Sequence, residues 1–331
     1  MKLVLAGVIT VVASLVGISC SSDRGMADRS DLSASAEKMA AKKEAGSMPG
    51  YRLEAPDTLH TLPDILEEAS GLTDVSATEV AMVQDELGII FLFNIDTGQI
   101  TREVPFASRG DYEGMTRVDN AMYVLESKGH LFEVQNWLGD KNVIQRWLPL
   151  PTSDNEGLCF DPVEDRILLS PKSRWKKGEV PKSIRPIFAV DIGSGKLLHE
   201  PVFVLNTDDI VRFALQHDLE IPSKAYKEGG EKIDLKFKPA SLAVHPVTND
   251  IFVISAVNRV LASFNRAGEV TGVHFLDAET FPKPEGITFL PNSSLVISSE
   301  AAKQKPTLAV FKWREGHDPA LQVASLPLPR D

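Results

Sequence analysis

Acidic side chains recur at regular intervals along the sequence. Glu113, Glu156 and Glu285 each precede a glycine at the start of a strand-like run. Three further glutamates stand at or just after the end of the next strand-like run: Glu86, Glu126 and Glu300. Carboxylate oxygens without a paired histidine or cysteine favour a hard cation, and calcium accepts about six to eight oxygen ligands. We therefore predict that these six glutamates bind calcium.

A purely structural role for the repeated glutamates is the alternative. A glutamate before a glycine can accept backbone N–H bonds from a neighbouring strand. A position can also recur only because the structure around it recurs. Residue types and spacing leave both interpretations open.

A basic loop is the second group of residues that could bind a ligand. Residues 172–185 contain six basic residues and Trp175. Among them Arg174, Lys176 and Lys177 could hold a phosphorylated or carboxylated ligand beside the acidic side chains. The alternative is a solvated loop that balances nearby acidic charge.

Familiar catalytic motifs are missing from the sequence. The seven histidines form no His-Glu-x-x-His pair, and there is no Gly-x-Ser-x-Gly motif for a nucleophile. His245 stands in a Val-His-Pro turn after a strand-like run, so we expect a structural role for it. Cys159 lies within a strand-like run and is expected to be a small buried hydrophobic residue. The sequence therefore favours no particular class of enzyme.

The elements that must position these side chains follow an internal repeat. Four residues recur at intervals of 43, 43, 84 and 45 positions, as Ser70-Gly71-Leu72-Thr73, Glu113-Gly114-Met115-Thr116, Glu156-Gly157-Leu158-Cys159, Ala240-Ser241-Leu242-Ala243 and Glu285-Gly286-Ile287-Thr288. Strand-like runs follow each copy, and four strands in about 40 to 45 residues is the size of one propeller blade. We predict an all-β fold, a five-bladed β-propeller.

The long interval of 84 residues holds one blade and an insertion. Between Glu156 and Ala240 only four strand-like runs occur, and the segment from Asp208 to Leu219 has its apolar residues at helical spacing. We predict a helical insertion in the third blade region, at about residues 206–238. The extended segment Tyr51–Ala55 is expected to close the ring by joining the last blade, because a closed ring leaves no free strand edge.

The N-terminus has the pattern of an exported lipoprotein. Lys2 precedes an apolar run that is too short to span a membrane and that ends at Gly17-Ile18-Ser19-Cys20. We predict a signal peptide at residues 1–19, a lipidated Cys20 and a flexible tether to residue 50, followed by the propeller at residues 51–331. The lipid would hold the domain in the bacterial cell envelope, at the inner or the outer membrane.

The overall charge argues against a nucleic-acid partner. The chain has a formal net charge of −11, and removal of residues 1–19 takes away one further positive charge. An acidic chain repels the phosphate backbone, whereas metal cations and basic partners are attracted.

Several segments resemble the SdiA-regulated family, which comprises bacterial envelope proteins distantly similar to NHL-repeat propellers. The segments are Leu62-Pro63, Ser70-Gly71-Leu72, Asp85-Glu86-Leu87-Gly88, Asp111-Tyr112-Glu113-Gly114 and Tyr123-Val124-Leu125-Glu126. The resemblance runs from about residue 51 to the C-terminus. It implies a five-bladed propeller with a bound calcium ion and no established enzyme activity. The chain departs from the family in the insertion, and at Ser70 and Ala240 where the repeat elsewhere has glutamate.

Two functional hypotheses follow from these features. The first is a membrane-anchored, calcium-binding propeller that acts as a binding or scaffold module for an envelope protein or a small ligand. The alternative is a calcium-dependent hydrolase of phosphoesters or lactones, in which the metal polarises the reacting oxygen.

Overall fold

The computed structural model describes residues 48–176, 178–225 and 230–314. The predicted signal peptide, Cys20 and nearly all of the predicted tether lie outside the described residues, as does Lys177. No helix in the described ranges is long and apolar enough to cross a membrane.

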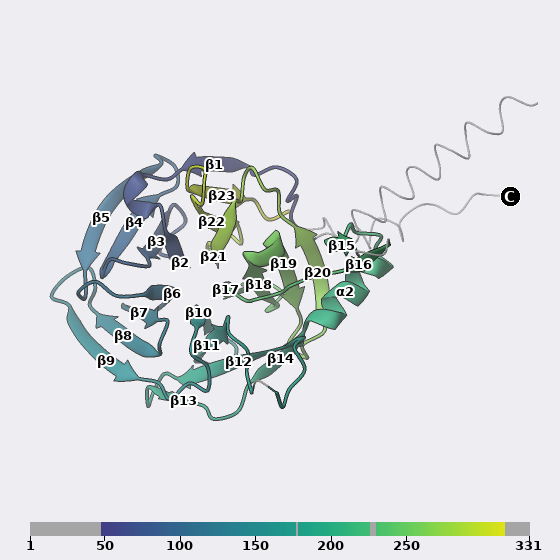
Figure 1. Cartoon of the computed structure of the whole chain (residues 1–331). Helices are drawn as coiled ribbons and strands as arrows, with labels where there is room; N and C mark the ends of the chain where they lie inside the picture. The colour runs from purple at the N-terminus through teal and green to yellow at the C-terminus, as the bar shows by residue number, and fades with distance from the viewer. Residues whose placement is uncertain (1–47, 177, 226–229, 315–331) are drawn as a thin grey trace, which may run out of the picture. The chain divides into compact units, whose positions relative to one another are not determined.

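Antiparallel strands form five sheets around a central axis (Figure 1). From the axis outward, the first sheet contains β2 (Ala69–Asp74), β3 (Glu79–Gln84), β4 (Ile89–Asn94) and β5 (Gln99–Pro105). The second contains β6 (Tyr112–Val118), β7 (Ala121–Glu126), β8 (His130–Gln135) and β9 (Asn142–Trp147). Each strand pairs with its neighbour in sequence, so each sheet is one up-and-down blade.

The third blade differs at its outer edge. Its strands are β10 (Asn155–Asp161), β11 (Arg166–Pro171) and β12 (Ile184–Asp191). The eight-residue β12 then pairs with two short strands, β13 (Lys196–Leu197) and β14 (Phe203–Asn206). The fourth strand of this blade is thus split into two pieces.

The last two blades complete the ring. The fourth contains β17 (Ser241–Val244), β18 (Ile251–Ser255), β19 (Val260–Phe264) and β20 (Val270–Phe275). The fifth contains β21 (Lys283–Phe289), β22 (Leu295–Glu300) and β23 (Thr307–Phe311), with β1 (Thr58–Thr61) as its outer strand. The prediction of a five-bladed propeller is confirmed.

The segment that closes the ring is not the predicted one. Strand β1 pairs antiparallel with β23, with Thr58 opposite Val310 and Thr61 opposite Thr307. The prediction that Tyr51–Ala55 makes this pairing is wrong. Tyr51 and Leu53 are instead buried in an apolar cluster between the fourth and fifth blades, so burial of their side chains determines the course of that segment.

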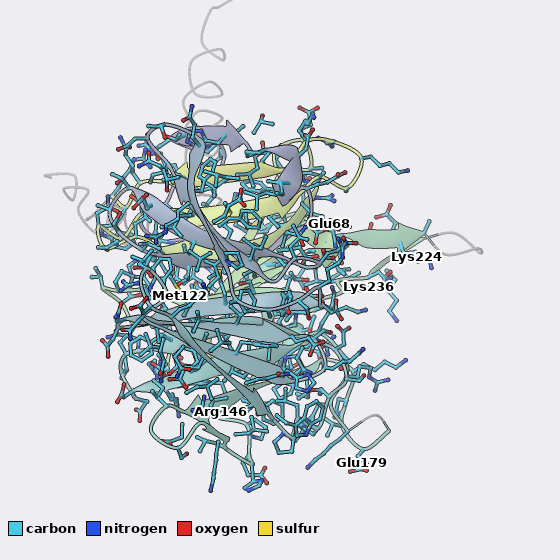
Figure 2. All side chains as sticks on the ribbon, turned by 90° about the vertical axis from the view of Figure 1, so that its left-hand side faces the viewer. Glu68, Met122, Arg146, Glu179, Lys224 and Lys236 are labelled. Atoms are coloured by element: carbon cyan, nitrogen blue, oxygen red, sulfur yellow. The ribbon has the colours of Figure 1, made fainter. Side chains whose placement is uncertain are left out.

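The insertion after the third blade contains a helix and a hairpin. Helix α2 (Thr207–Gln216) begins where the Asn206 side chain accepts a hydrogen bond from the Asp208 N–H, a typical N-cap. Ile210 of the helix is buried in the apolar cluster between the third and fourth blades. The hairpin of β15 (Ser223–Ala225) and β16 (Glu231–Ile233) projects from the face of the propeller that also carries Glu68 (Figure 2).

The hydrophobic core lies between the blades. Five clusters of buried apolar side chains occur in the described residues, one at each junction of adjacent blades. The inner strands approach so closely that a Cβ on Gly114 would overlap the carbonyl oxygen of Glu156 in the next blade. A Cβ on Gly157 would likewise overlap the side chain of Leu242. The repeated glycine is therefore required by the narrow axis of the propeller.

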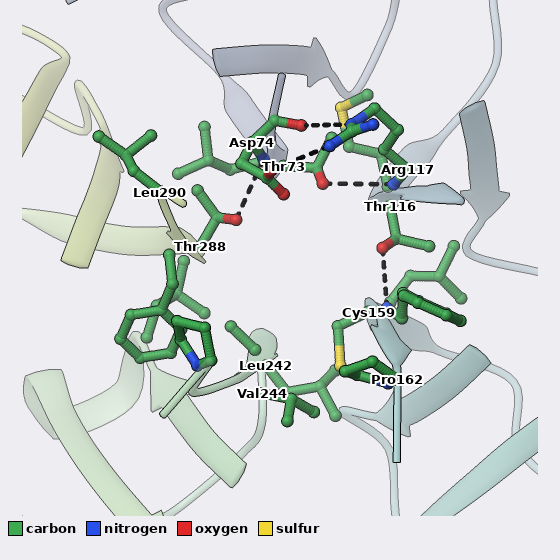
Figure 3. A pocket seen from close by; sticks show the side chains of 18 of the residues that line it. Thr73, Asp74, Thr116, Arg117, Cys159, Pro162, Leu242, Val244, Thr288 and Leu290 are labelled. Carbon is green, nitrogen blue, oxygen red and sulfur yellow. Dashed lines mark hydrogen bonds and ion pairs between the residues drawn. The ribbon is translucent and has the colours of Figure 1, made fainter. Parts of the chain in front are cut away.

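Threonine hydroxyls link three of the inner strands to the next blade. Thr73, Thr116 and Thr288 share the fourth position of the repeat (Figure 3). Each hydroxyl oxygen accepts a hydrogen bond of 2.8 to 3.2 Å from a backbone N–H of the adjacent inner strand, that of Arg117, Phe160 or Asp74. Cys159 and Ala243 hold this position in the other two blades, and neither accepts such a bond from the described residues.

His245 anchors the segment that precedes the first blade. Its Nδ1 accepts hydrogen bonds from the N–H groups of Val247 and Thr248, both at 3.1 Å, which places the ring proton on Nε2. Nε2 then donates to the hydroxyl of Tyr51 at 2.9 Å, and this hydroxyl donates to the Ser293 carbonyl at 2.6 Å. Burial lowers the pKa of His245 to about 4, so the ring is neutral. His245 links the fourth blade to the N-terminal segment.

We expect the neutral His245 to make stability depend on pH. The unfolded imidazole takes up a proton below about pH 6.5, whereas the folded ring does so only near pH 4. The contribution of His245 is therefore complete above pH 6.5 and is lost as the pH falls toward 4. The stability lost through His245 between pH 7 and pH 5 amounts to about 2 kcal/mol.

Denaturant unfolding of wild type and His245→Gln at pH 7 and pH 5 measures this contribution. Other titrating groups affect both proteins alike, so the wild type should lose about 2 kcal/mol more than the variant. Equal losses in the two proteins would contradict a neutral, buried imidazole.

Candidate functional site

Three of the predicted glutamates are the extra residues of β-bulges. In the second blade Tyr112 pairs with Glu126 and Gly114 with Leu125, which leaves Glu113 unpaired. The same shift leaves Glu156 unpaired in the third blade and Glu285 in the fifth. A bulge turns a side chain away from the regular alternation of the strand. The inner strands approach each other closely at the glycine, and the bulge lies just before it. Together these two features direct three carboxyl groups to one mouth of the channel.

Two lysines enter this group of carboxylates. Lys172 donates a hydrogen bond to Oε1 of Glu156. Lys283 donates to Oε2 of Glu300 at 2.6 Å and lies 3.2 Å from Oε1 of Glu285. Glu156, Glu285 and Glu300 are only 2, 4 and 9% exposed, so these carboxyl groups are largely withdrawn from water, whereas the side chains of Lys172 and Lys283 are partly exposed. We call Glu113, Glu156, Glu285, Glu300, Lys172 and Lys283 the acidic mouth.

Burial and mutual repulsion raise the pKa values of the carboxyl groups in the acidic mouth. Burial, then the charge of Glu285, raises the pKa of Glu156 to about 9. Burial, then Asp111, raises the pKa of Glu113 to about 8. Burial also raises the pKa of Glu285, although Lys172 and Lys283 oppose the shift. The two lysines therefore compensate only part of the negative charge, and at neutral pH some carboxyl groups hold a proton.

A second acidic group adjoins the first. Burial, followed by repulsion from Glu68, raises the pKa of Asp85 to about 7, and Glu300 contributes to the same shift. Oδ1 of Asp85 is buried and accepts no hydrogen bond from the described residues, whereas Oε1 of Glu285 has only the ammonium group of Lys283, 3.2 Å away. Both oxygens have free acceptor capacity at the mouth.

The six predicted ligands are only partly brought together. Glu113, Glu156, Glu285 and Glu300 belong to the acidic mouth. Glu86 is half exposed and pairs with Arg109 on a loop. Glu126 pairs with His130. Within the described residues no three aspartate, glutamate, histidine or cysteine side chains are placed to hold a metal ion.

The basic loop contributes to the mouth through its first residue. The loop joins β11 to β12, and Lys172 alone of its basic residues pairs with the repeated glutamates within the described part of the chain. Arg185 is buried and donates to the backbone carbonyls of Lys182, Ile184 and Phe237, which is a structural role. Lys176 lies over the ring of Trp175 at 4.5 Å. Anion binding by Arg174 and Lys176 stays a prediction.

Sequence reasoning missed two participants in the mouth. Lys283 lies two positions before Glu285, so its side chain can reach the same carboxylate along one strand. Glu68 lies just before the first copy of the repeat, where that copy lacks its glutamate. A search for ionisable residues within two positions of each repeat would have found both.

Comparison with known proteins supports the fold and does not identify the family. No protein-family model matches the chain, and no curated protein matches it. Among solved structures, the glutaminyl cyclase of Myxococcus xanthus has a TM-score of 0.50 at 11% identity, covering 78% of this chain and 94% of its own. A streptogramin B lyase has a TM-score of 0.42 at 13% identity, covering 77% of this chain and 97% of its own.

The identities are so low that the likeness extends to the fold alone. The chain has the architecture of a five-bladed β-propeller. Its resemblance to the SdiA-regulated family stays a prediction.

We expect Lys172→Met to destabilise the protein by about 2 to 3 kcal/mol at pH 8, because Glu156 and its neighbours lose a partly buried counter-charge. The loss should be smaller at pH 6, where more of the carboxyl groups in the mouth are protonated. Denaturant unfolding at both pH values measures it.

Lys305→Met is the matched control, because Lys305 pairs with Asp64 at the surface and both side chains are exposed. Such an exposed pair contributes at most about 1 kcal/mol. Equal effects of the two substitutions would show that Lys172 does not compensate buried charge.

Proposed function

We propose that this protein is a lipid-anchored propeller of the bacterial cell envelope whose acidic mouth binds a cation, with calcium as the first candidate. In this role the domain is a binding or scaffold module rather than a catalyst. The observation that carries the proposal is the surplus of buried carboxyl groups over lysines at one end of the channel.

The donor chemistry at the mouth fits calcium. All candidate ligands are carboxylate oxygens, and one buried oxygen, Oδ1 of Asp85, lacks a hydrogen-bond partner among the described residues. Carboxyl groups with raised pKa values gain most from a nearby cation, because the cation favours their charged form. In the structure, however, the ammonium groups of Lys172 and Lys283 already contact carboxylates that would bind the ion. Calcium binding therefore requires Lys172 to leave Glu156.

Calcium would neutralise the mouth and hold three blades together. Glu113, Glu156 and Glu285 come from different inner strands, so one ion between them would cross-link the second, third and fifth blades. The face around the mouth would then present a rigid surface to an envelope partner or a small ligand. The hairpin β15–β16 projects from this face and offers further contact area (Figure 2).

Thermal unfolding with calcium, with magnesium and with chelator tests the cation site. We expect calcium to raise the unfolding midpoint selectively, since a ligand that binds only the folded state stabilises it. Saturation at about one hundred times the dissociation constant corresponds to about 2.7 kcal/mol. Glu113→Gln with Glu156→Gln should abolish the calcium effect.

Lys172→Met provides the sharper comparison. If calcium and Lys172 compete for Glu156, the variant should bind calcium more tightly than the wild type and should recover most of its lost stability. Lys305→Met should respond like the wild type. A midpoint that is indifferent to calcium in both the wild type and Lys172→Met would refute a calcium site at the mouth.

Calcium-dependent hydrolysis is the second candidate function. It is favoured by the same surplus of buried carboxyl groups, which could hold a calcium ion that polarises the reacting phosphoryl or carbonyl oxygen. The binding proposal predicts no turnover of phosphomonoesters or lactones in the presence of calcium. Turnover that disappears in Glu113→Gln and Glu156→Gln would show that the mouth is catalytic and would contradict the binding proposal.

A further inference from the structure

The opposite end of the channel contains a separate cavity of about 320 Å³. Residues from the inner strands of all five blades line it, together with the turns that follow these strands (Figure 3). None of the carboxylates of the acidic mouth contributes to its lining. Its volume lies at the lower end of the range for small-molecule sites.

An apolar layer separates this cavity from the acidic mouth. It is formed by the third residue of each repeat, one from every blade: Leu72, Met115, Leu158, Leu242 and Ile287. These side chains are at most 2% exposed, and along each inner strand they stand between the first position of the repeat and the threonine position. A ligand at one end is therefore shielded from direct contact with the other.

Hydroxyl groups above this layer offer hydrogen-bond donors. Thr73, Thr116 and Thr288 use their oxygens to accept backbone N–H bonds. Their O–H groups donate to no described residue. A bound molecule with acceptor oxygens could therefore receive hydrogen bonds from up to three blades.

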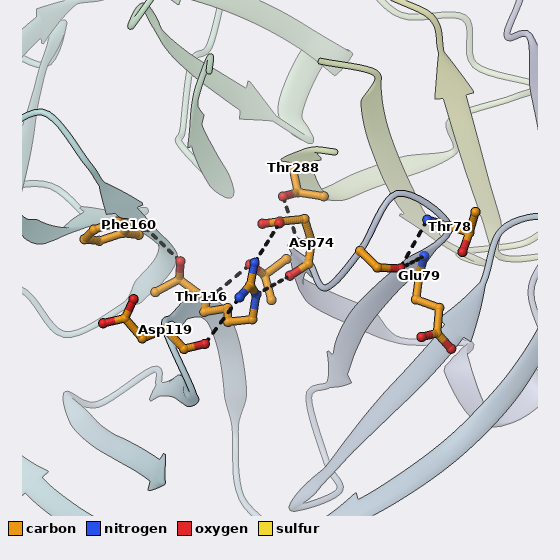
Figure 4. Close-up of polar contacts among 10 residues, drawn as sticks. Asp74, Thr78, Glu79, Thr116, Asp119, Phe160 and Thr288 are labelled. Carbon is orange, nitrogen blue, oxygen red and sulfur yellow. Dashed lines mark hydrogen bonds and ion pairs between the residues drawn. The ribbon is translucent and has the colours of Figure 1, made fainter. Parts of the chain in front are cut away.

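One ion pair occupies the polar side of the cavity (Figure 4). Arg117 donates from its terminal nitrogen to Oδ2 of Asp74 at 3.2 Å and from Nε to the Asp74 carbonyl at 3.1 Å. It also donates to the Asp119 carbonyl at 3.3 Å. Two guanidinium N–H groups are left without a described acceptor, while the charge of Arg117 is compensated by Asp74.

The remaining wall is apolar and is open to solvent at its rim. Val244 and Leu290 line it, and exposed prolines form its edge at the same turn of three blades: Pro162, Pro246 and Pro291. Burial raises the pKa of Cys159 well above its ordinary range, so its thiol adds a largely apolar surface and no reactive thiolate. Proline restricts the backbone of these turns, which favours a preformed opening.

We propose that this cavity binds an uncharged, mainly apolar small molecule that carries acceptor oxygens, such as an ester, a lactone or a ketone. The free O–H and N–H donors require acceptors, and the apolar wall favours hydrocarbon. A net charge on the ligand is disfavoured because Asp74 already compensates Arg117, and because the carboxylate of Asp119, the other charged lining residue, is exposed and screened by water. The cavity has room for about ten water molecules, and hence for a ligand of roughly that number of non-hydrogen atoms.

Methyl NMR of the protein with three probes of similar size tests this proposal. The probes are δ-decalactone, decanoate and decylammonium, which are neutral, anionic and cationic. We expect δ-decalactone to shift the methyl signals of Met115 and Ile287, both in the cavity, and to leave buried Met82 outside it unchanged. The charged probes should bind at least about tenfold more weakly, because each must bury an uncompensated charge.

Two substitutions separate binding in the cavity from binding elsewhere. Ala243→Leu fills the cavity and should abolish the shifts, whereas Ala278→Leu on an exposed loop should not change them. Thr116→Val should weaken δ-decalactone binding about fivefold through the lost O–H donor, while Thr116→Ser should retain it.

The inference is overturned if no probe shifts Met115 or Ile287 in the wild type. It is also overturned if a charged probe binds as tightly as the lactone, or if Ala243→Leu binds like the wild type. None of these outcomes involves the acidic mouth, so the proposed cation site is tested independently of this cavity.

Discussion

The close approach of five inner strands around one axis is the constraint on which the rest of this structure depends. Where the strands are nearest, a side chain on Gly114 or Gly157 would overlap the next blade. The residue before each of these glycines is the extra residue of a β-bulge, so its side chain leaves the regular alternation of the strand. The packing requirement of the axis and the direction of the glutamates thus have a common origin.

That constraint creates an electrostatic problem at one end of the channel. Carboxyl groups from separate blades meet where water is largely excluded, and their pKa values rise. Lys172 and Lys283 relieve part of the repulsion, each from a different blade. A site that is already stabilised by internal ammonium groups can bind a metal ion only in exchange for one of them. Selectivity would then depend on a competition within the protein as well as on ligand geometry.

The same repeat gives the two ends of the channel different chemistry. Its first position supplies carboxylates, its third an apolar layer, and its fourth the threonines that connect blades through backbone N–H groups. The pattern is broken in the third and fourth blades, where Cys159 and Ala243 replace threonine. The threonine hydroxyls of the cavity consequently lie on the side of the fifth, first and second blades, and the side of the third and fourth blades has none. Imperfections of the repeat, rather than the repeat itself, make the cavity asymmetric.

The sequence by itself determined the all-β class, the number of blades, the place of the helical insertion and the gathering of Glu113, Glu156 and Glu285, because each depends on periodic spacing along one chain. It failed for the ring-closing strand: Tyr51–Ala55 was expected to be extended but forms a turn, with Tyr51 buried beside His245, and Thr58–Thr61 pairs with β23 instead. It also could not show that Lys172 lies on Glu156, that Glu86 and Glu126 pair elsewhere, or that an apolar layer divides the channel. Those features depend on which side chains from different blades lie within contact distance of each other. The spacing of residues along the chain does not determine these distances.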